Sequence, residues 1–354
     1  MVAIPSNLPS SIQADMEVLL DHLPTLEHGK LIRQVLETIL RMMSRESDRL
    51  DWKILNYALL DMEQGFQMFH PYRHTRKVTI FGSARMGADN PDYILAQQFA
   101  EQVTQLGFMV MTGAGGGIME AGNAGAGPEN SFGLNIQLPF EQGANPVMTD
   151  NPKLINFKYF FTRKLFFIRE SDALVLFPGG FGTQDEGFES LTLIQTGKAD
   201  PMPVVLIDHP GGNYWKDWDT YIRDHLMERG LISPDDPSLY TITDNVDDAC
   251  HAISSFYRVY HSCRYVGDRL VIRLKCELPD AAVALLNEEY GDILSKGQIE
   301  KSAALPEEKN DETIPLPRLV MHFNHRDFGK LHQFIRRLND LGDSRPELEH
   351  PEQK

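Results

Sequence analysis

The sequence predicts an α/β fold built on a doubly wound parallel sheet. Between about residues 77 and 260, short apolar runs typical of strands alternate with longer segments of helical periodicity. Three of the predicted strands end in glycine-bearing turns that lead toward a helix, as expected in a nucleotide-binding sheet. The pattern changes on both sides of this region, so we also expect a helical N-terminal extension and a small α+β C-terminal appendage.

The N-terminal segment, residues 1–75, is expected to be helical over residues 10–70. One apolar stripe has spacings of three and four residues and follows Asp51, which can cap the helix. Its members are Trp52, Leu55, Leu59, Met62, Phe66 and Phe69. Such a stripe is typical of a core or an oligomer interface, so we assign no chemistry to this segment. The basic stretch at 72–77 is interpreted as a solvated linker.

Residues 76–262 form the predicted nucleotide-binding domain, with a Rossmann-like order of elements. Strands are expected at 78–81, 108–111, 134–138, 173–177, 204–207 and 239–243. Helices are expected at about 91–106, up to Ala126, and over 160–170, 215–228 and 246–260. Ligands on such sheets lie at the carboxyl ends of the strands. The turns at 82–83, 113–117 and 178–183 should therefore converge on one crevice.

The turn at 178–183 is the most informative of the three. It follows the apolar strand at 173–177 and precedes a long helical pattern. Glycine lets a ligand approach the backbone, and the free N–H groups and dipole of the following helix suit a phosphate. Thr183 and Glu186 have the spacing of a capping box, with Thr183 as the N-cap residue. The other interpretation makes Glu186 a carboxylate held beside a bound phosphorylated sugar.

Residues 263–354 have the pattern of the small α+β appendage. Leu270, Ile272, Leu274 and Cys276 alternate as on a half-buried strand. The other expected elements are a helix at 280–290, a long charged loop at 300–315, a strand at 319–323, a helix at 328–338 and a frayed tail at 343–354.

Composition argues against several kinds of partner. The net charge of −16 disfavours nucleic acid and anionic membranes, although a local nest of N–H groups can still bind a phosphate. The three cysteines have the spacing of neither a zinc site nor a disulfide framework. The sequence has no signal-peptide pattern and no membrane-spanning run, so we expect a cytoplasmic protein.

The glycine turn at 113–117 resembles a dinucleotide fingerprint, but a second feature of that fingerprint is missing. An acidic residue is expected about 20 residues later, and the third strand instead runs into Pro139. NAD and FAD are therefore discounted. A P-loop is excluded because the sequence has no Gly-Lys-Ser/Thr after a glycine turn. A mononucleotide or sugar-phosphate site remains.

Four motifs in this order resemble the LOG family, the cytokinin riboside 5′-monophosphate phosphoribohydrolases often labelled lysine decarboxylases. They are Gly82-Ser83, the stretch from Gly115 to Ala121, Phe161-Thr162-Arg163-Lys164, and Pro178 to Thr183 with Glu186. The resemblance spans about residues 78–260. The stretches 134–139 and 191–198 are similar to the larger bacterial branch of the family.

The resemblance implies hydrolysis of the N-glycosidic bond of a nucleoside 5′-monophosphate, AMP or a cytokinin riboside monophosphate, with no metal and no other cofactor. Glu186 would stabilise an oxocarbenium-like ribose or orient the attacking water, and Arg163 would bind a substrate oxyanion. These two residues are the predicted catalytic pair. The predicted substrate-binding residues are Gly82, Ser83, Gly115, Gly116, Gly117, Met119, Lys164, Gly179, Gly180, Phe181, Gly182, Thr183, Asp185 and Thr192.

Two residues depart from the family pattern. Gln184 and Gly187 stand where apolar residues are usual, which keeps a second hypothesis open, a nucleotide sensor or carrier without turnover. Amino-acid decarboxylation would need a Schiff-base lysine. Lys164, the only lysine within the motifs, lies next to Arg163, where the family binds substrate.

The helix expected at 160–170 carries more apolar residues than one buried stripe needs. Phe161, Leu165 and Ile168 are taken as the buried stripe, which leaves Arg163 and Lys164 off it. The surplus agrees with the homodimer or larger even oligomer that the family resemblance implies. The helices at 10–70 could instead cover this surface.

Overall fold

The computed structural model describes residues 9–137, 143–308 and 312–342. Three predicted features fall wholly or partly outside the described residues. They are the tail at 343–354, the end of the third strand at Leu138 and Pro139, and the middle of the loop at 300–315.

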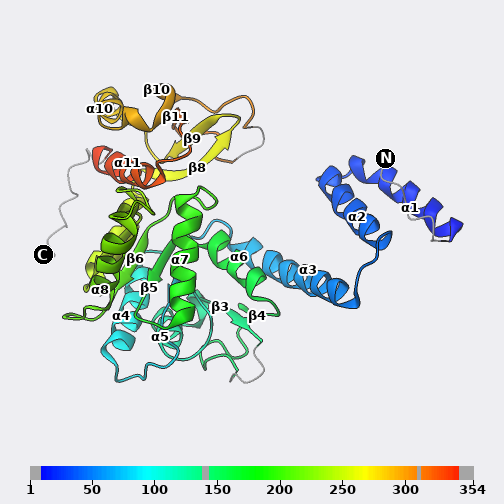
Figure 1. Ribbon diagram of the computed structural model, residues 1–354, viewed down its shortest axis with the longest axis horizontal. Helices are drawn as coiled ribbons and strands as arrows, with labels where there is room; N and C mark the ends of the chain where they lie inside the picture. The colour runs from blue at the N-terminus through cyan, green and yellow to red at the C-terminus, as the bar shows by residue number, and fades with distance from the viewer. Residues whose placement is uncertain (1–8, 138–142, 309–311, 343–354) are drawn as a thin grey trace, which may run out of the picture. The chain divides into compact units, whose positions relative to one another are not determined.

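The chain divides into two compact units, Met1–Glu63 and Gln64–Lys354. The first unit is helical, as its sequence predicts (Figure 1). Its elements are α1 (Ser10–His22), the short helix η1 (Leu23–Thr25), α2 (Gly29–Met43) and most of α3 (Arg49–Phe69), which continues into the second unit. Three leucines, Leu20, Leu23 and Leu40, give this unit a small core. The predicted domain boundaries at residues 75 and 262 stay a prediction.

The second unit is built on a sheet of seven parallel strands in the order β4-β3-β2-β1-β5-β6-β7. The strands are β1 (Lys77–Phe81), β2 (Met109–Thr112), β3 (Ser131–Ile136), β4 (Leu154–Phe157), β5 (Ala173–Leu176), β6 (Val204–Ile207) and β7 (Tyr240–Thr243). Every residue of β1, β2, β5 and β6 is buried, which is why these strands are apolar almost throughout. The strand order reverses between β1 and β5, which confirms the predicted doubly wound fold.

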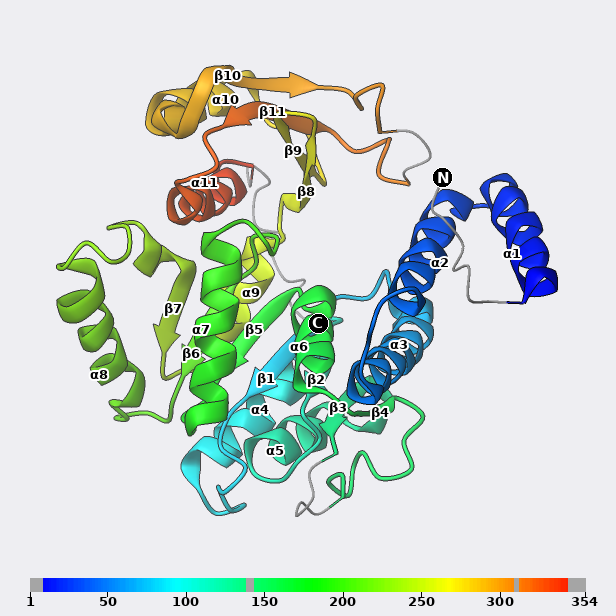
Figure 2. The same ribbon diagram turned by 45° about the vertical axis from the view of Figure 1, so that its right-hand side comes forward.

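Helices cover both faces of this sheet (Figures 1 and 2). One face carries α4 (Pro91–Gln105), α5 (Ile118–Ala126) and α9 (Val246–Phe256), and the other carries α6 (Phe160–Glu170), α7 (Phe181–Gln195) and α8 (Tyr214–Tyr221). None of the helices within the described ranges is both long and apolar enough to cross a membrane.

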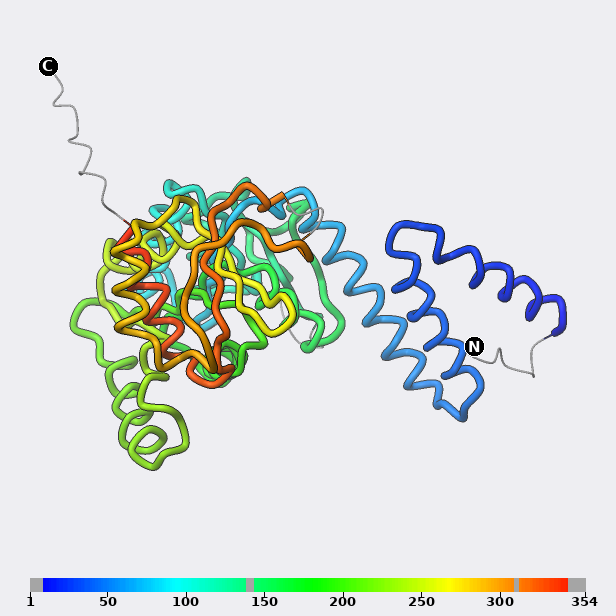
Figure 3. The backbone as a smooth tube through the Cα atoms, turned by 90° about the horizontal axis from the view of Figure 1, so that it is seen from above, coloured from blue at the N-terminus to red at the C-terminus, as the bar shows by residue number. Residues whose placement is uncertain are grey.

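A second sheet, antiparallel with the order β10-β11-β9-β8, forms the C-terminal appendage. Its elements are β8 (Tyr260–Val266), β9 (Arg269–Leu274), α10 (Asp280–Tyr290), β10 (Leu294–Ser302), β11 (Arg318–Phe323) and α11 (Phe328–Leu341). β9 and β10 are joined through α10 and separated by β11, which is a split β-α-β arrangement. The two helices lie side by side (Figure 3), and the predicted α+β appendage is confirmed.

Four elements, β4, β8, β10 and α9, differ from the prediction. β4 was not predicted, because it is a four-residue edge strand in which Asn156 is exposed. β10 was not predicted either, because a polar edge strand lacks the apolar alternation of a half-buried one. The predicted helix at 246–260 ends at Phe256, and its last predicted residue, Tyr260, is the first residue of β8.

α11 packs the appendage onto the parallel sheet. Phe334 and Leu338 of α11 belong to the same continuous core as Phe256 of α9 and Tyr260 of β8. The side chain of Asn339, also on α11, donates to the carbonyl of Phe256 at 2.7 Å and accepts from the amide of Tyr260 at 3.0 Å. The two sheets are thus connected by one apolar core and by polar contacts inside it.

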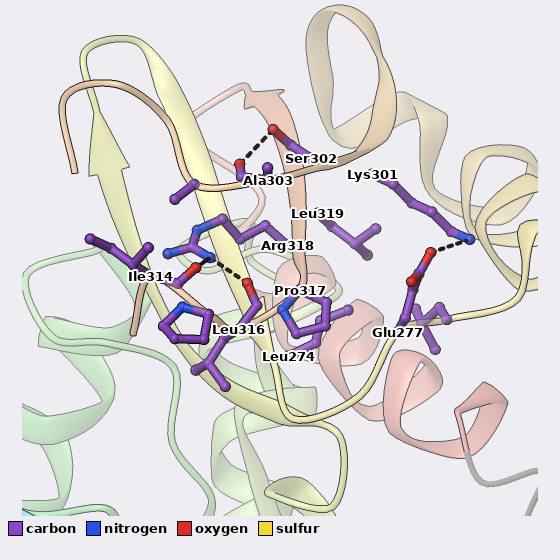
Figure 4. A pocket seen from close by; sticks show the side chains of 13 residues that line it. Leu274, Glu277, Lys301, Ser302, Ala303, Ile314, Leu316, Pro317, Arg318 and Leu319 are labelled. Carbon is purple, nitrogen blue, oxygen red and sulfur yellow. Dashed lines mark hydrogen bonds and ion pairs between the residues drawn. The ribbon is translucent and has the colours of Figure 1, made fainter. Parts of the chain in front are cut away.

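The other face of the second sheet holds a buried charge group. The carboxylate of Glu308 accepts from Arg273 and from Arg318, at 2.9 Å each. Burial alone would raise the pKa of Glu308, but its hydrogen bonds and the two guanidinium groups lower it below its usual value. Beside this group lies a cavity of about 410 Å³ (Figure 4). Its two cations, Arg318 and Lys301, are paired with Glu308 and with Glu277, so neither attracts a ligand anion.

Candidate active site

Ser83 connects the three glycine turns. Its amide donates to the carbonyl of Pro178 in the turn after β5, at 3.1 Å. Its own carbonyl accepts from the amide of Ile118, which follows the turn after β2, at 3.0 Å. The predicted convergence of the three turns at the carboxyl edge of the sheet is therefore confirmed.

Glycine is required where the turns meet. A Cβ on Gly82 would lie 2.6 Å from the side chain of Ile118. Gly117 has φ +64°, and a Cβ there would lie 2.3 Å from the carbonyl oxygen of Ser83. These two glycines allow close packing of one turn on the next, so their presence does not by itself demand a ligand.

The turn at 113–117 is held from two sides. Met119 of α5 lies against Gly115, where a Cβ would be 2.7 Å from the Met119 Cε. Asn145 donates from its backbone amide to the carbonyl of Ala114 at 2.8 Å and from its side chain to the carbonyl of Gly115 at 3.0 Å. Gly116 has more room, because a Cβ built there would lie 3.6 Å or more from every neighbouring atom. Sequence reasoning missed Asn145, because it lies in a loop without a local pattern.

The capping-box interpretation of Thr183 is wrong. α7 begins at Phe181 with Gly180 as the N-cap residue, so Thr183 lies inside the first turn. Its side chain packs under the turn instead, where a Cβ on Gly179 would lie 2.1 Å from the Thr183 Oγ1. The sequence pattern matched because a capping box needs only the residue spacing, whereas the helix starts three residues earlier than that spacing implies.

The outer side of this turn is open. Hypothetical Cβ atoms on Gly180 and Gly182 would meet no atom within 4 Å. The side chain of Phe181 between them is 96% exposed. The first N–H groups of α7 have no partner within the helix. This arrangement leaves room for a phosphate at the positive end of the helix dipole.

Gln184 and Gly187 both have structural explanations. Gln184 Nε2 donates to the Tyr214 hydroxyl at 2.7 Å, and that hydroxyl donates to the carbonyl of Gly179 at 2.6 Å. A Cβ on Gly187 would lie 2.9 Å from a methyl group of Leu176, so glycine lets α7 approach β5 closely. The two departures support the position of the turn and of its helix. Tyr214, on α8, was not predicted as a site residue.

Glu186 and Lys164 form the charged centre of the site. Lys164 Nζ lies 3.3 Å from Glu186 Oε2 and 2.9 Å from Asp185 Oδ2, and it also donates to Glu189. Burial would lower the pKa of Lys164, but the hydrogen bonds to Glu189 and Asp185 raise it to about 12. Burial raises the pKa of Glu186 above its usual value, even though Lys164 and Arg163 act in the opposite direction.

Arg163 lies on the same helix as Lys164 and reaches toward the turn after β2. One of its terminal nitrogens lies 3.8 Å from the position that a Cβ on Gly113 would occupy. Its guanidinium carbon is 5.1 Å from the ring centre of Phe160 and 5.5 Å from that of Phe167. The site therefore has a second cation near Glu186, on the side of the turn at 113–117.

The predicted buried stripe of α6 is wrong. The buried residues are Thr162, Phe166 and Phe167, whereas Phe161 is 52% exposed and Leu165 is 43% exposed. The end of α3 covers Phe166, because a Cβ on Gly65 would lie 2.2 Å from its ring. Many residues of this helix are apolar, so its periodicity fits more than one face.

Two predicted binding residues differ in their environment. Asp185 is exposed and pairs with Lys164, close to Glu186. The exposed Thr192 lies two turns further along α7, and its hydroxyl donates to the carbonyl of Phe188 at 2.7 Å. Within the described ranges, no hydrogen bond or ion pair joins Thr192 to the glycine turns.

Comparison with known proteins agrees with these motifs. Residues 111–253 match a family model described as "Possible lysine decarboxylase". Over 105 residues the chain is 33% identical to a cytokinin riboside 5′-monophosphate phosphoribohydrolase of Mycobacterium tuberculosis, which covers 29% of this chain and 53% of that protein. Both matches support the resemblance of this part of the chain to the LOG family.

A second relative shares a shorter stretch with this chain. It is the probable cytokinin riboside 5′-monophosphate phosphoribohydrolase LOGL3 of Oryza sativa subsp. japonica, 40% identical over 72 residues, 20% of this chain and 32% of that protein. The matched segments thus span about half or less of the length of these two relatives. Among solved structures, the molybdenum cofactor carrier protein of Chlamydomonas reinhardtii is 18% identical, with 50% of this chain and 95% of that chain covered and a TM-score of 0.37.

The decarboxylase activity in the description of the family model does not fit Lys164, the lysine within the motifs. Such an activity would use a lysine amine to form a Schiff base, and the amine must lose its proton first. Lys164 is bound by three carboxylates, and its pKa is raised to about 12. It therefore stays an ammonium group at neutral pH.

Proposed function

We propose that the protein is a nucleoside 5′-monophosphate phosphoribohydrolase, which hydrolyses the N-glycosidic bond of AMP or of a cytokinin riboside monophosphate. The observation that carries this proposal is the position of Glu186. Its buried carboxylate lies one turn of helix beyond the open glycine turn. It is 3.3 Å from Lys164 Nζ, and the charge of Arg163 also acts on it. The names of the two relatives support the same reaction.

In this proposal the phosphate binds at the glycine turns. The open backbone at Gly180 and Gly182 accepts the phosphate oxygens, and the first N–H groups of α7 donate to them. Gly116 and its neighbours in the turn after β2 supply further N–H groups. Arg163, next to that second turn, binds a phosphate or ribose oxygen through its fork of N–H groups.

The bond that breaks joins C1′ of the ribose to a ring nitrogen of the base. The electron pair of this bond leaves with the nitrogen, the base takes up a proton, and positive charge develops on the ribose ring. Glu186 stabilises that charge and accepts a proton from the water whose oxygen bonds to C1′. Transfer of one proton to the departing base restores the carboxylate. The products are the free base and ribose 5-phosphate. Lys164 keeps a positive charge near Glu186, which favours its ionised form.

A nucleotide sensor without turnover is the alternative. Gln184 and Gly187 were the features that favoured it, and both are accounted for by packing and by the bond to Tyr214. The enzyme is therefore the better-supported hypothesis.

We further propose a homodimer or larger even oligomer formed through exposed apolar residues of α6, namely Phe160, Phe161 and Leu165. A cytoplasmic location and a role in cytokinin activation stay predictions.

The deciding experiment incubates the full chain with AMP and separates the products by chromatography. Equal amounts of adenine and ribose 5-phosphate are expected. Glu186→Gln, measured in parallel, controls for contaminating nucleosidases. AMP binding without adenine release would support the sensor, and the absence of both binding and release would overturn the proposed site.

A further inference from the structure

A second cavity, of about 210 Å³, lies where α11 of the appendage packs against β7 and α9 of the parallel sheet. It is lined by Thr241, Ala252, Ser255, Phe256, Arg336, Asn339 and Asp340. None of these residues belongs to a glycine turn or to the group around Glu186. The cavity is therefore distinct from the candidate active site.

Arg336 is the unusual residue of this cavity. Its guanidinium donates to the hydroxyl oxygen of Thr241 at 3.0 Å, and within the described part of the chain it has no carboxylate partner. Burial lowers its pKa below the usual value, and no acidic group compensates. Its neighbour Arg337 instead makes two hydrogen bonds of 2.9 Å to Glu289. A partly buried cation without an anion is costly, and a bound anion removes that cost.

The other polar groups of the cavity fall into two kinds. Asn339 is occupied, since it donates to the carbonyls of Phe256 and Ile335 at 2.7 and 2.8 Å. Asp340 is on the exposed rim and pairs with Arg258 at 3.2 Å. The hydroxyl of Ser255 makes no hydrogen bond to any described residue, so it can donate to a ligand.

We propose that this cavity is a binding site for a small oxyanion, a carboxylate or phosphate group held between Arg336 of α11 and Ser255 of α9. The fork of guanidinium N–H groups matches two oxygens of such a group, and the hydroxyl of Ser255 supplies a further donor. The volume suits a free oxyanion or one group of a small metabolite. One donor lies on α11 of the appendage and the other on α9, which covers the parallel sheet. A bound anion therefore stabilises the packing of the appendage against the parallel sheet.

Isothermal titration calorimetry of the full chain with inorganic phosphate, and separately with malonate, tests this site. Phosphate should also bind the glycine turns, so the comparison between variants is decisive. Arg336→Gln should weaken one binding event at least about tenfold, since charge-assisted hydrogen bonds are lost. Arg337→Gln, on the same helix but paired with Glu289, should bind like the parent protein.

Each outcome of the titrations has a defined meaning. If Arg336→Gln loses a binding event with phosphate but not with malonate, the site is assigned to phosphate groups. If it loses a binding event with both ligands, the site is assigned to oxyanions in general. Identical isotherms for the parent, Arg336→Gln and Arg337→Gln would overturn the proposal. If Arg336→Gln does not fold, Ser255→Ala takes its place, with an expected weakening of about fivefold. Parent-like binding by that variant would equally overturn it.

Discussion

The ammonium group of Lys164 lies 3.3 Å from the carboxylate of Glu186. The same ammonium group also binds Asp185 and Glu189, so one cation is shared among three carboxylates. Lys164 and Arg163 lower the pKa of Glu186, whereas the nearby carboxylate of Glu189 raises it. Burial then outweighs the attraction, and Glu186 keeps a raised pKa, as expected of a group that exchanges protons.

Glu186→Gln should lower the rate of base release from AMP by about 10²- to 10⁴-fold, the usual contribution of a general base. AMP affinity should stay close to that of the parent protein, because the proposed phosphate contacts are backbone N–H groups. Release rates from chromatography and affinities from calorimetry check both statements. Glu189→Gln, which also removes a carboxylate from Lys164, is the matched control and should retain most turnover. Equal release by the Glu186→Gln variant and the parent would remove Glu186 from the mechanism.

The pH dependence of turnover should have an acidic limb set by Glu186. Burial raises the pKa of this acid, so the carboxylate takes up its proton at a higher pH than an ordinary glutamate would. Activity that needs the ionised form therefore rises as the pH increases through this raised value. Lys164→Met removes the strongest attraction that lowers this pKa, so the limb should move to higher pH. An unmoved limb, or one that moves to lower pH, would contradict the assignment.

Arg163→Ala should reduce AMP turnover by roughly 100-fold or more, because an oxyanion-binding cation is lost. The stability cost should be small. Its guanidinium lies over the rings of Phe160 and Phe167, a contact worth about 0.5–1 kcal/mol. Melting temperature and turnover are measured together. Arg169→Ala is the control, since Arg169 lies on the same helix, 5.0 Å from the ring of Phe66, and away from the turns. A large fall in melting temperature for Arg163→Ala alone would make Arg163 structural.

Tyr214→Phe should raise the KM for AMP several-fold with little change in kcat. The variant removes the 2.6 Å hydrogen bond to the carbonyl of Gly179, and such a bond contributes about 1 kcal/mol to holding the turn. Gln184→Leu, which removes only the donor to Tyr214, should have a smaller effect. Steady-state kinetics measure both variants. Tyr221→Phe, at an exposed position of α8, should match the parent. An unchanged KM for Tyr214→Phe would show that the bond does not position the turn.

Light scattering should find the full chain as a dimer or a larger even oligomer at micromolar concentration. Phe161 is 52% exposed on α6, beside other exposed apolar residues, and Phe161→Glu should dissociate the assembly by placing a charge in the interface. Tyr221→Glu, which changes a residue that is 50% exposed on α8, is the control and should assemble normally. A monomeric parent protein would refute this interface.

The parts of the fold that could be predicted have local causes. β1, β2 and β5 are buried throughout, and the glycine turns that follow them are needed for close packing, so both features are visible in the sequence. Asn145 and Tyr214 could not be predicted, because each reaches its turn from a distant loop or helix. The α6 stripe and the Thr183 cap were wrong for a related reason. Spacing alone does not reveal which neighbours cover a helix or where it begins.

The core shared through α11 makes the appendage and the parallel sheet inseparable in folding. Leu338 and Phe334 fill the same apolar interior as Phe256 and Tyr260, and Asn339 is hydrogen bonded within it. Heat or denaturant should then melt both sheets in a single cooperative transition. Removal of the appendage would expose the apolar residues that α9 and β8 contribute to this shared core. A shortened chain that ends before β8 should therefore aggregate more readily than the full chain.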